Sequence, residues 1–131
     1  MKPKKKFSKS LARRKLHVAW SRAVRERDGY YCQWCLFDGR HNKNLCNHAH
    51  HIVSRSLSGT AGAFAVDNGM TLCYYCHINR LKAWVDEYIA FRDDWLARNV
   101  GVNYFTLRER YRGIVKFTEE FYEERLGKLV G

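Results

Sequence analysis

Apolar side chains recur at helical spacing near the N-terminus of the chain. The segment 10–28 begins at Ser10, which is a suitable N-cap, and ends before Gly29. Its apolar positions share one helical face, while arginines and lysines occupy much of the remainder. The pattern therefore predicts an amphipathic lead-in helix with a basic outer side. The apolar positions are Leu16, Trp20, Ala23 and Val24.

The pattern changes in the middle of the chain, where turn residues and short apolar runs replace helical spacing. Turn residues at 38–39 and 42–44 precede a β-type run around residues 45–53. Residues 54–66 are rich in serine and glycine and predict a loop or a bent return strand. Asp67-Asn68-Gly69 is a strong turn signal. We expect a β-hairpin here.

Helical spacing returns after the middle segment. Residues 77–99 are rich in helix formers and predict one long helix, and two shorter helices are expected at 104–112 and from Thr118 to about residue 126. Thr118 is a good N-cap, followed by two glutamates that complement the helix dipole. The aromatic residues in these helices are expected to form core rather than a base-stacking surface, because they recur at helical spacing.

Positive charge is concentrated near the N-terminus. The chain has 131 residues and a formal net charge of +11, and its first forty residues hold twelve lysines and arginines against three acidic residues. Such a block binds polyanions by releasing counterions, and nucleic acid is the usual partner. An anionic membrane is the alternative partner. No apolar run reaches the roughly 20 residues needed to span a bilayer, and no signal-peptide core follows the lysines. We therefore expect DNA rather than membrane as the partner, and a cytoplasmic location.

Two cysteine pairs give the most specific signal in the chain. Cys32-Gln-Trp-Cys35 and Cys73-Tyr-Tyr-Cys76 have the spacing at which four thiolates close a tetrahedral zinc site. A redox-active pair would need only one such motif in a thioredoxin-like context, which is missing. The fifth cysteine, Cys46, is expected to be spare. Five cysteines fit a reducing compartment better than a disulfide framework.

Histidines lie inside and directly after the segment that the cysteines bracket. His50 and His51 follow the first pair, and His77 adjoins the second. Four sulfurs suffice for a structural zinc site, so these imidazoles are available for a second, open metal site. His48 is expected to be surface or packing, with Cys46 and His48 as alternative zinc ligands left open. His17 and His41 have no motif context and are expected to be exposed or interfacial.

Five elements in a fixed order carry a family resemblance. They are Cys32-x-x-Cys35, Ala49-His50-His51-Ile52-Val53, Asp67-Asn68, Leu72-Cys73-x-x-Cys76 and His77. With them, residues 22–82 resemble the zinc-containing HNH endonucleases. The resemblance implies a mostly helical α+β chain with a ββα-metal core, in which a β-hairpin and a helix hold a divalent cation under the scissile phosphate, stapled by the four-cysteine zinc site.

The resemblance also implies a role for each matching residue. His51 would be the general base that activates water, and Asn68 would hold the catalytic loop and orient that base. His50 and His77 would bind the catalytic cation, for which Mg²⁺ or Mn²⁺ is expected first and Ni²⁺ or Zn²⁺ next. A neutral imidazole can take a proton from water near pH 7. Neighbouring strand residues point to opposite faces, so both His50 and His51 reach one site only where the strand ends or bulges.

A narrower resemblance concerns the phage NinG/Rap recombination nucleases, which act on branched DNA. It covers Ala49-x-His51, the loop ending at Asn68 and the helix running through Leu96. That family has glycine at the position of His50 and asparagine at that of His77. The departure favours a more ordinary HNH metal site and leaves open whether branched or recombination-intermediate DNA is the substrate. A phage or its bacterial host cytoplasm is the expected setting.

The domain organisation follows from these assignments. We expect a flexible basic tail at residues 1–9, an HNH nuclease domain at 10–100 and a C-terminal helical extension at 101–131 packed on the same domain. The sequence leaves the oligomeric state open, a homodimer included. Basic residues near the motif are the candidate DNA contacts. They are Arg22, Arg25, Arg27, Arg55, Arg80 and Lys82.

Two other classes of function remain open from sequence. A zinc-dependent nucleic-acid-binding module without turnover would share the charge and the cysteines but would have no use for His51 or Asn68. A protein-interaction domain would instead place its function in the C-terminal helices. The sequence predicts the nuclease, a phosphodiester hydrolase acting on DNA, because it alone accounts for the ordered histidines and the asparagine.

Overall fold

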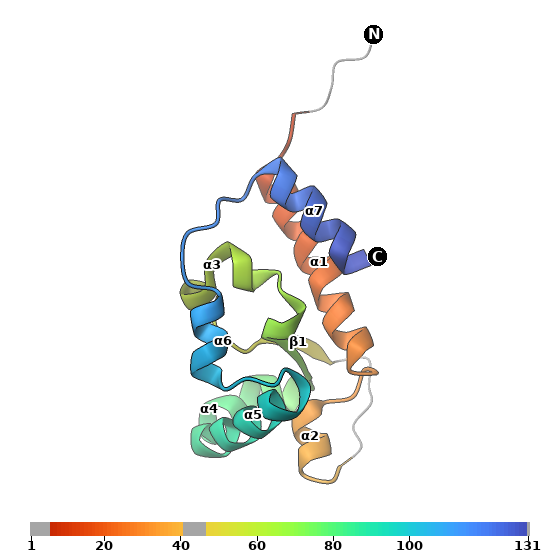
Figure 1. Cartoon of the computed structure of the whole chain (residues 1–131). Coiled ribbons are helices and arrows are strands. Elements are labelled where there is room, and N and C mark those ends of the chain that lie inside the picture. The colour runs from red at the N-terminus through yellow and green to blue at the C-terminus, as the bar shows by residue number, and fades with distance from the viewer. Residues whose placement is uncertain (1–5, 41–46, 131) are drawn as a thin grey trace.

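The computed structural model describes residues 6–40 and 47–130 (Figure 1). Predictions that concern the tail at 1–5, His41, the turn at 42–44 and Cys46 lie outside the described residues. In chain order the elements are α1 (Lys9–Arg27), α2 (Gln33–Phe37), β1 (His48–His51), α3 (Arg55–Ala63), the 3₁₀ turn η1 (Val66–Asn68), β2 (Gly69–Leu72), the π-helical turn η2 (Tyr75–Arg80), α4 (Leu81–Ala83), α5 (Val85–Asn99), α6 (Tyr104–Arg110) and α7 (Glu119–Val130).

The lead-in helix forms as predicted, with a small shift at its start. Ser8 rather than Ser10 is the N-cap of α1, and its side chain accepts a hydrogen bond from the backbone N–H of Leu11. The helix ends before Gly29, whose φ of 62° is in the left-handed region that glycine tolerates. The apolar face is buried, with Trp20 fully inaccessible to solvent.

The sheet is an antiparallel pair whose first strand was predicted, while its second strand, Gly69–Leu72, begins in the predicted turn. His50 of β1 pairs with Met70 of β2, and His51 pairs with Gly69. The two strands are joined by helical turns, so the expectation of a loop or return strand at 54–66 was wrong. Small side chains explain the error, because they resemble a loop in sequence yet allow α3 to pack tightly. A Cβ on Gly62 would lie 2.2 Å from that of Ser58, so only glycine fits there.

The long helix predicted over 77–99 is broken. The turn η2 and the short helix α4 occupy the first part of this range. Helix α5 begins only after Trp84, whose φ of −128° and ψ of 56° are not helical. The second cysteine pair enters η2 directly, where the backbone N–H of His77 bonds to the carbonyl of Cys73. The wide π-turn belongs to the knuckle, and α5 is a separate packing element.

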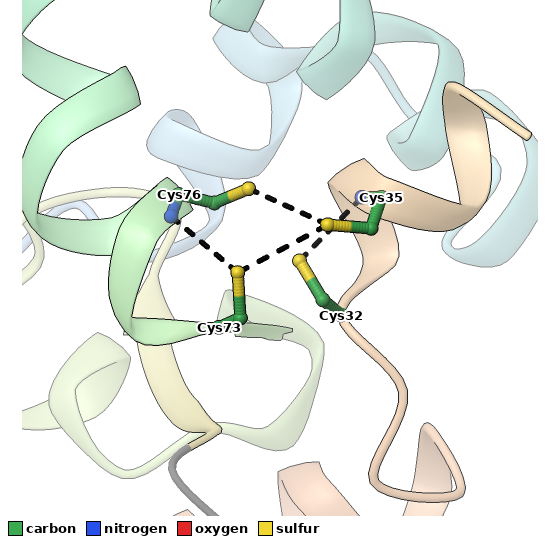
Figure 2. Close-up of side chains that lie close together, drawn as sticks. All are labelled: Cys32, Cys35, Cys73 and Cys76. Atoms are coloured by element: carbon green, nitrogen blue, oxygen red, sulfur yellow. Dashed lines mark hydrogen bonds between the residues drawn. The ribbon is translucent and has the colours of Figure 1, made fainter. Parts of the chain in front are cut away.

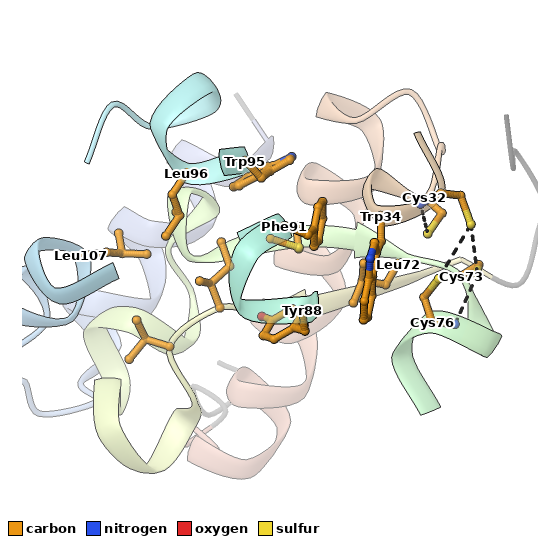
Figure 3. Packing of buried hydrophobic residues seen from close by; sticks show 14 of the residues in the cluster. Cys32, Trp34, Leu72, Cys73, Cys76, Tyr88, Phe91, Trp95, Leu96 and Leu107 are labelled. Atoms are coloured by element: carbon orange, nitrogen blue, oxygen red, sulfur yellow. Dashed lines mark hydrogen bonds between the residues drawn. The ribbon is translucent and has the colours of Figure 1, made fainter. Parts of the chain in front are cut away.

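The main core lies between the cysteine pairs, the sheet and α5 (Figure 3). Trp34 of α2 stacks on Phe91 of α5 with ring centroids 5.5 Å apart, and Trp95 donates a hydrogen bond to Gln33. Both contacts join α5 to the first knuckle. The sheet is therefore held against α5 on one face, while α1 contacts the sheet as well.

The C-terminal helices pack on the same body. Helix α7 lies along α1 (Figure 1), and Phe117 and Phe64 join a second apolar cluster with the first half of α1. Thr118 caps α7 as predicted, since its hydroxyl accepts from the N–H of Phe121. Among the described residues no helix is long and apolar enough to cross a membrane. The chain is mostly helical with one small sheet, which confirms the predicted α+β class.

Candidate metal centre and histidine site

The four predicted cysteines form one compact cluster of sulfur atoms (Figure 2). Their sulfurs all lie within 4.8 Å of one another, and all four residues are buried. The Sγ of Cys35 is 3.7 Å from that of Cys76 and 4.0 Å from that of Cys73. Zinc–sulfur bonds of about 2.3 Å place tetrahedral sulfurs about 3.8 Å apart. The cluster therefore fits a zinc ion without rearrangement.

The backbone of both knuckles turns its N–H groups toward the sulfurs. The N–H of Cys35 points at the Sγ of Cys32, and that of Cys76 at the Sγ of Cys73. The hydrogen bond between Cys76 and Cys32 lowers the pKa of Cys32 and raises that of Cys76, so the pair favours one thiolate. Such partners stabilise thiolate ligands and hold them in place.

Arg80, a predicted DNA contact, packs against this cluster. Its guanidinium donates to the Sγ of Cys76 and to the carboxylate of Asp38 at 2.7 Å, and it stacks over Trp34. Its side chain is only 11% exposed. Arg80 therefore has a structural role at the cluster, and a DNA contact by this residue stays a prediction.

The two adjacent histidines lie on opposite faces of β1, as the regular pairing requires. The imidazole of His51 stacks on Trp20, with centroids 4.0 Å apart and planes 8° from parallel. The imidazole of His50 bonds to the hydroxyl of Tyr88 at 2.7 Å and lies beside His77. Strand β1 ends at His51. The end of the strand is thus the place where both histidines can approach one ligand.

His51 is held in one tautomer by the backbone. Its Nε2 lies 2.9 Å from the carbonyl oxygen of Ala63, which can only accept, so Nε2 carries the proton. In the neutral ring Nδ1 then bears a lone pair, and no other described residue bonds to it. Burial lowers the pKa of His51 to about 4, although the bond to Ala63 raises it, and nearby Arg55 lowers it further. The ring is neutral at pH 7 and able to accept a proton.

Trp20 fixes this ring from the other side. Its indole N–H donates to the carbonyl of Ala65 at 2.8 Å, and its side chain is fully buried. Gly69 gives it room, since a Cβ there would lie 2.8 Å from the indole. Sequence analysis assigned Trp20 only to the apolar face of a helix. Its contact with His51 joins segments 31 residues apart, and no local pattern reports it.

Asn68 locks the backbone around His51 without touching its ring. The fully buried side chain accepts from the N–H of Val53 at 2.7 Å and donates to the carbonyls of Val53 and Gly62, both at 2.9 Å. Val53 follows His51 by two residues, and Gly62 precedes the carbonyl that holds its Nε2. Asn68 therefore fixes both ends of the loop that orients His51.

Three histidines gather on the other face of the sheet. His48 and His50 share that face of β1, and the Nδ1 of His48 lies 3.0 Å from the Nδ1 of His77. The ring centroids of His50 and His77 are 5.3 Å apart. The structure thus brings together the predicted ligands His50 and His77 and adds His48. The signal for His48 was present, because residues two apart in a strand share a face.

These imidazoles do not form a closed ligand set. Among the described residues, only the four cysteines place three or more candidate ligand atoms within 4.8 Å. Burial and the neighbouring charges of His77 and His51 lower the pKa of His50 to about 3, and burial also lowers that of His77. Neutral imidazoles with free nitrogen lone pairs suit an open cation site of the catalytic kind.

The other predicted DNA contacts differ in how far their side chains are already bonded to protein groups. Arg27 donates to the carbonyls of Val66 and Gly69 and to Asp28, so it ties α1 to the sheet. Arg25 bonds to Ser21 and lies over Tyr30. Arg22, Arg55 and Lys82 are exposed. Arg22 is about 200° around α1 from Trp20 and so lies on the face away from His51.

Comparison with protein families matches residues 32–81 to the HNH endonucleases. The matched segment runs from the first cysteine to the residue after η2 and contains both strands and the four histidines of the site, His48, His50, His51 and His77. No curated protein and no solved structure matches the chain. The mostly helical fold with its small sheet and four-cysteine cluster is consistent with the ββα-metal arrangement of that family.

Proposed function

We propose that this chain is a metal-dependent endonuclease that hydrolyses phosphodiester bonds of DNA, since residues 32–81 match the HNH endonuclease family model. The observation that carries the proposal is the state of His51. Its Nε2–H is fixed on the carbonyl of Ala63 and its ring is stacked on Trp20, so Nδ1 is the nitrogen left to accept a proton.

The division of labour follows the two faces of β1. His51 takes a proton from water through Nδ1, and the water attacks the phosphorus. Asn68 keeps the backbone on both sides of His51 in place during the reaction. A divalent cation on the opposite face would stabilise negative charge on the phosphate and on the leaving oxygen. A phosphate at the end of β1 lies within reach of both faces.

His50 and His77 are the proposed ligands of that cation, and His48 is a third candidate. Since Tyr88 occupies the Nε2 of His50, the ring's Nδ1 is the nitrogen open to a cation. The close approach of His48 and His77 offers an alternative pair. Calorimetric titration of Mn²⁺ or Ni²⁺ into single alanine variants at these three positions separates the pairs. The two substitutions that abolish binding identify the ligands, and a small effect of all three would contradict the site.

The function is tested with purified protein on linear, nicked, flap and four-way-junction DNA in the presence of Mg²⁺ or Mn²⁺. We expect cleavage of at least one substrate, and the panel also tests whether branched DNA is preferred. Intact DNA throughout, with zinc bound and the protein folded, would instead support a binding module without turnover. If the His51→Ala protein binds and cleaves DNA as wild type does, His51 is not the general base.

A further inference from the structure

A basic cavity lies directly beside His51, on the face of β1 away from the proposed cation. Its volume is about 270 Å³, and it is lined by Arg13, His17, Arg55, Gly59, Thr60, Ala63 and Phe64. Ala63 is the residue whose carbonyl holds His51, and the rings of His17 and His51 are 6.1 Å apart. The cavity therefore adjoins the proposed base through two separate contacts.

The lining supplies hydrogen-bond donors of positive charge and no carboxylate. Arg13 and His17 are four residues apart on α1 and so share the face that carries Trp20. Arg55 comes from the start of α3. Among the residues that line this cavity none is acidic. Two guanidinium groups converge on the cavity from two different elements, which is the arrangement that recognises phosphate oxygens.

The internal contacts hold the donors in place. Arg55 donates to the Nδ1 of His17 at 2.7 Å, so that nitrogen is the acceptor and the neutral ring carries its proton on Nε2. Arg13 stacks over Phe117, with its guanidinium carbon 4.5 Å from the ring centroid. Guanidinium groups held by stacking or one bond keep their remaining N–H groups for a ligand. The cavity is smaller than most drug-sized pockets, which run from about 300 Å³ upward.

We propose that this cavity, the Arg13–Arg55 pocket, binds a backbone phosphate of the DNA next to the scissile phosphate. This inference rests on the proposed function for the identity of the nucleic acid, and it names a substrate contact that sequence analysis missed at Arg13. The pocket fixes the strand relative to His51. Arg22, which sequence analysis favoured, lies on the opposite side of α1.

The test is DNA affinity rather than cleavage, so it does not depend on catalysis. Fluorescence anisotropy with a labelled duplex, without added divalent cation, compares wild type with Arg13→Gln/Arg55→Gln across a range of salt concentrations. Loss of one phosphate contact should weaken binding about five- to tenfold near 0.15 M salt and reduce the log–log salt slope by about 1. Unchanged affinity and slope would overturn the pocket.

A matched control removes the same charge elsewhere. Arg14 is exposed on α1 but lines a different hollow with Lys15 and Val18, and Arg98 is exposed on α5 beside Asp94. The variant Arg14→Gln/Arg98→Gln should bind DNA as wild type does. An equal loss in both double variants would show general charge attraction and no pocket.

A second double variant tests whether a folding defect explains the loss of affinity. Arg13→Lys/Arg55→Lys keeps the charge but loses the planar fork, and we expect affinity below wild type at an unchanged melting temperature. Affinity equal to wild type would overturn the proposed phosphate recognition. Titration with inorganic phosphate, followed by NMR of the arginine Nε–H signals, should show binding far weaker than that of DNA. A phosphate affinity above that of DNA would reassign the pocket to a free anion.

The two proposals fail in different ways. If the His51→Ala protein cleaves DNA like wild type, the assignment of the base fails while the affinity difference at the pocket stands. If both double variants bind alike, the pocket fails while loss of cleavage in His51→Ala still supports the nuclease.

Discussion

The cysteine cluster and the histidine site are built by opposite rules, although the same 50-residue segment contains both. The four sulfurs are buried, close together and supported by backbone N–H groups and Arg80. The histidines are only half-buried, lie on two faces of one strand and leave nitrogen atoms free. A structural metal site is closed and a catalytic one is open. From this difference we expect the cysteine cluster to determine folding and the histidine site to determine turnover.

The largest expected effect is loss of the fold when the cysteine cluster is broken. Cys73→Ser should abolish cooperative melting, because structural zinc contributes about 10–16 kcal/mol in small zinc domains. Circular dichroism melting and zinc content by atomic absorption measure this. Cys46→Ser, at the cysteine predicted to be spare, is the matched control and should keep one zinc per chain. A Cys73→Ser protein that melts like wild type would contradict the claim that the cysteine cluster determines folding.

His51→Ala should have the converse effect. Loss of a general base lowers turnover by roughly 10²- to 10⁴-fold, while zinc content and the cooperative melt remain. Single-turnover cleavage and melting of the same preparation measure both sides. His41→Ala, which changes a histidine without motif context, should cleave normally. Equal cleavage by the His51 and His41 variants would show that the histidine site is not catalytic.

Asn68→Ala should lower both stability and turnover, because this residue holds the fold together and also orients His51. Its loss leaves the buried N–H of Val53 without a partner, at about 1–3 kcal/mol before relaxation, and leaves the carbonyls of Val53 and Gly62 with only their longer bonds from Ser58 and Ala65. We expect a lower unfolding free energy by urea titration together with lower turnover, but unchanged zinc content. An Asn68→Ala protein of normal stability would contradict the hydrogen bonds.

The smallest expected effect is the difference in turnover between two variants of Trp20, both of which should be less stable than wild type because this side chain is fully buried. Trp20→Phe keeps an aromatic ring over His51, whereas Trp20→Leu removes it, and both lose the bond to Ala65. Aromatic contacts contribute about 0.5–1.5 kcal/mol, so kcat of the Leu variant should be roughly two- to tenfold below that of the Phe variant at similar stability. NMR of His51 would report the looser ring. Equal kcat in the two variants would leave Trp20 a packing residue only.

Much of the site could be predicted because its signals are local in sequence. The knuckle spacing places two cysteines on one turn, and the order of the elements identifies His50, His51, Asn68 and His77. The break at Trp84 and the helix at residues 55–63 could not be predicted, because tertiary packing of small residues and of α5 overrode the local pattern.

The roles of the arginines also could not be predicted from local sequence patterns. Charge along the sequence indicated a nucleic-acid partner but could not separate the arginines that contact protein from those that are free. Arg27 and Arg80 are bound to carbonyls, carboxylates and sulfur. Arg13, which had no local motif, lines the cavity beside His51.

The sequence by itself determined the four cysteines of the candidate metal cluster, the order of the motif and the positive charge, because each follows from residue type and spacing. Only the tertiary structure decided which nitrogen of His51 is free, that Trp20 and Asn68 hold it, and which arginines adjoin it. Those facts depend on contacts between α1, α3 and the sheet, whose residues lie far apart in the chain. Local patterns do not encode such contacts, whereas packing of the folded chain fixes them.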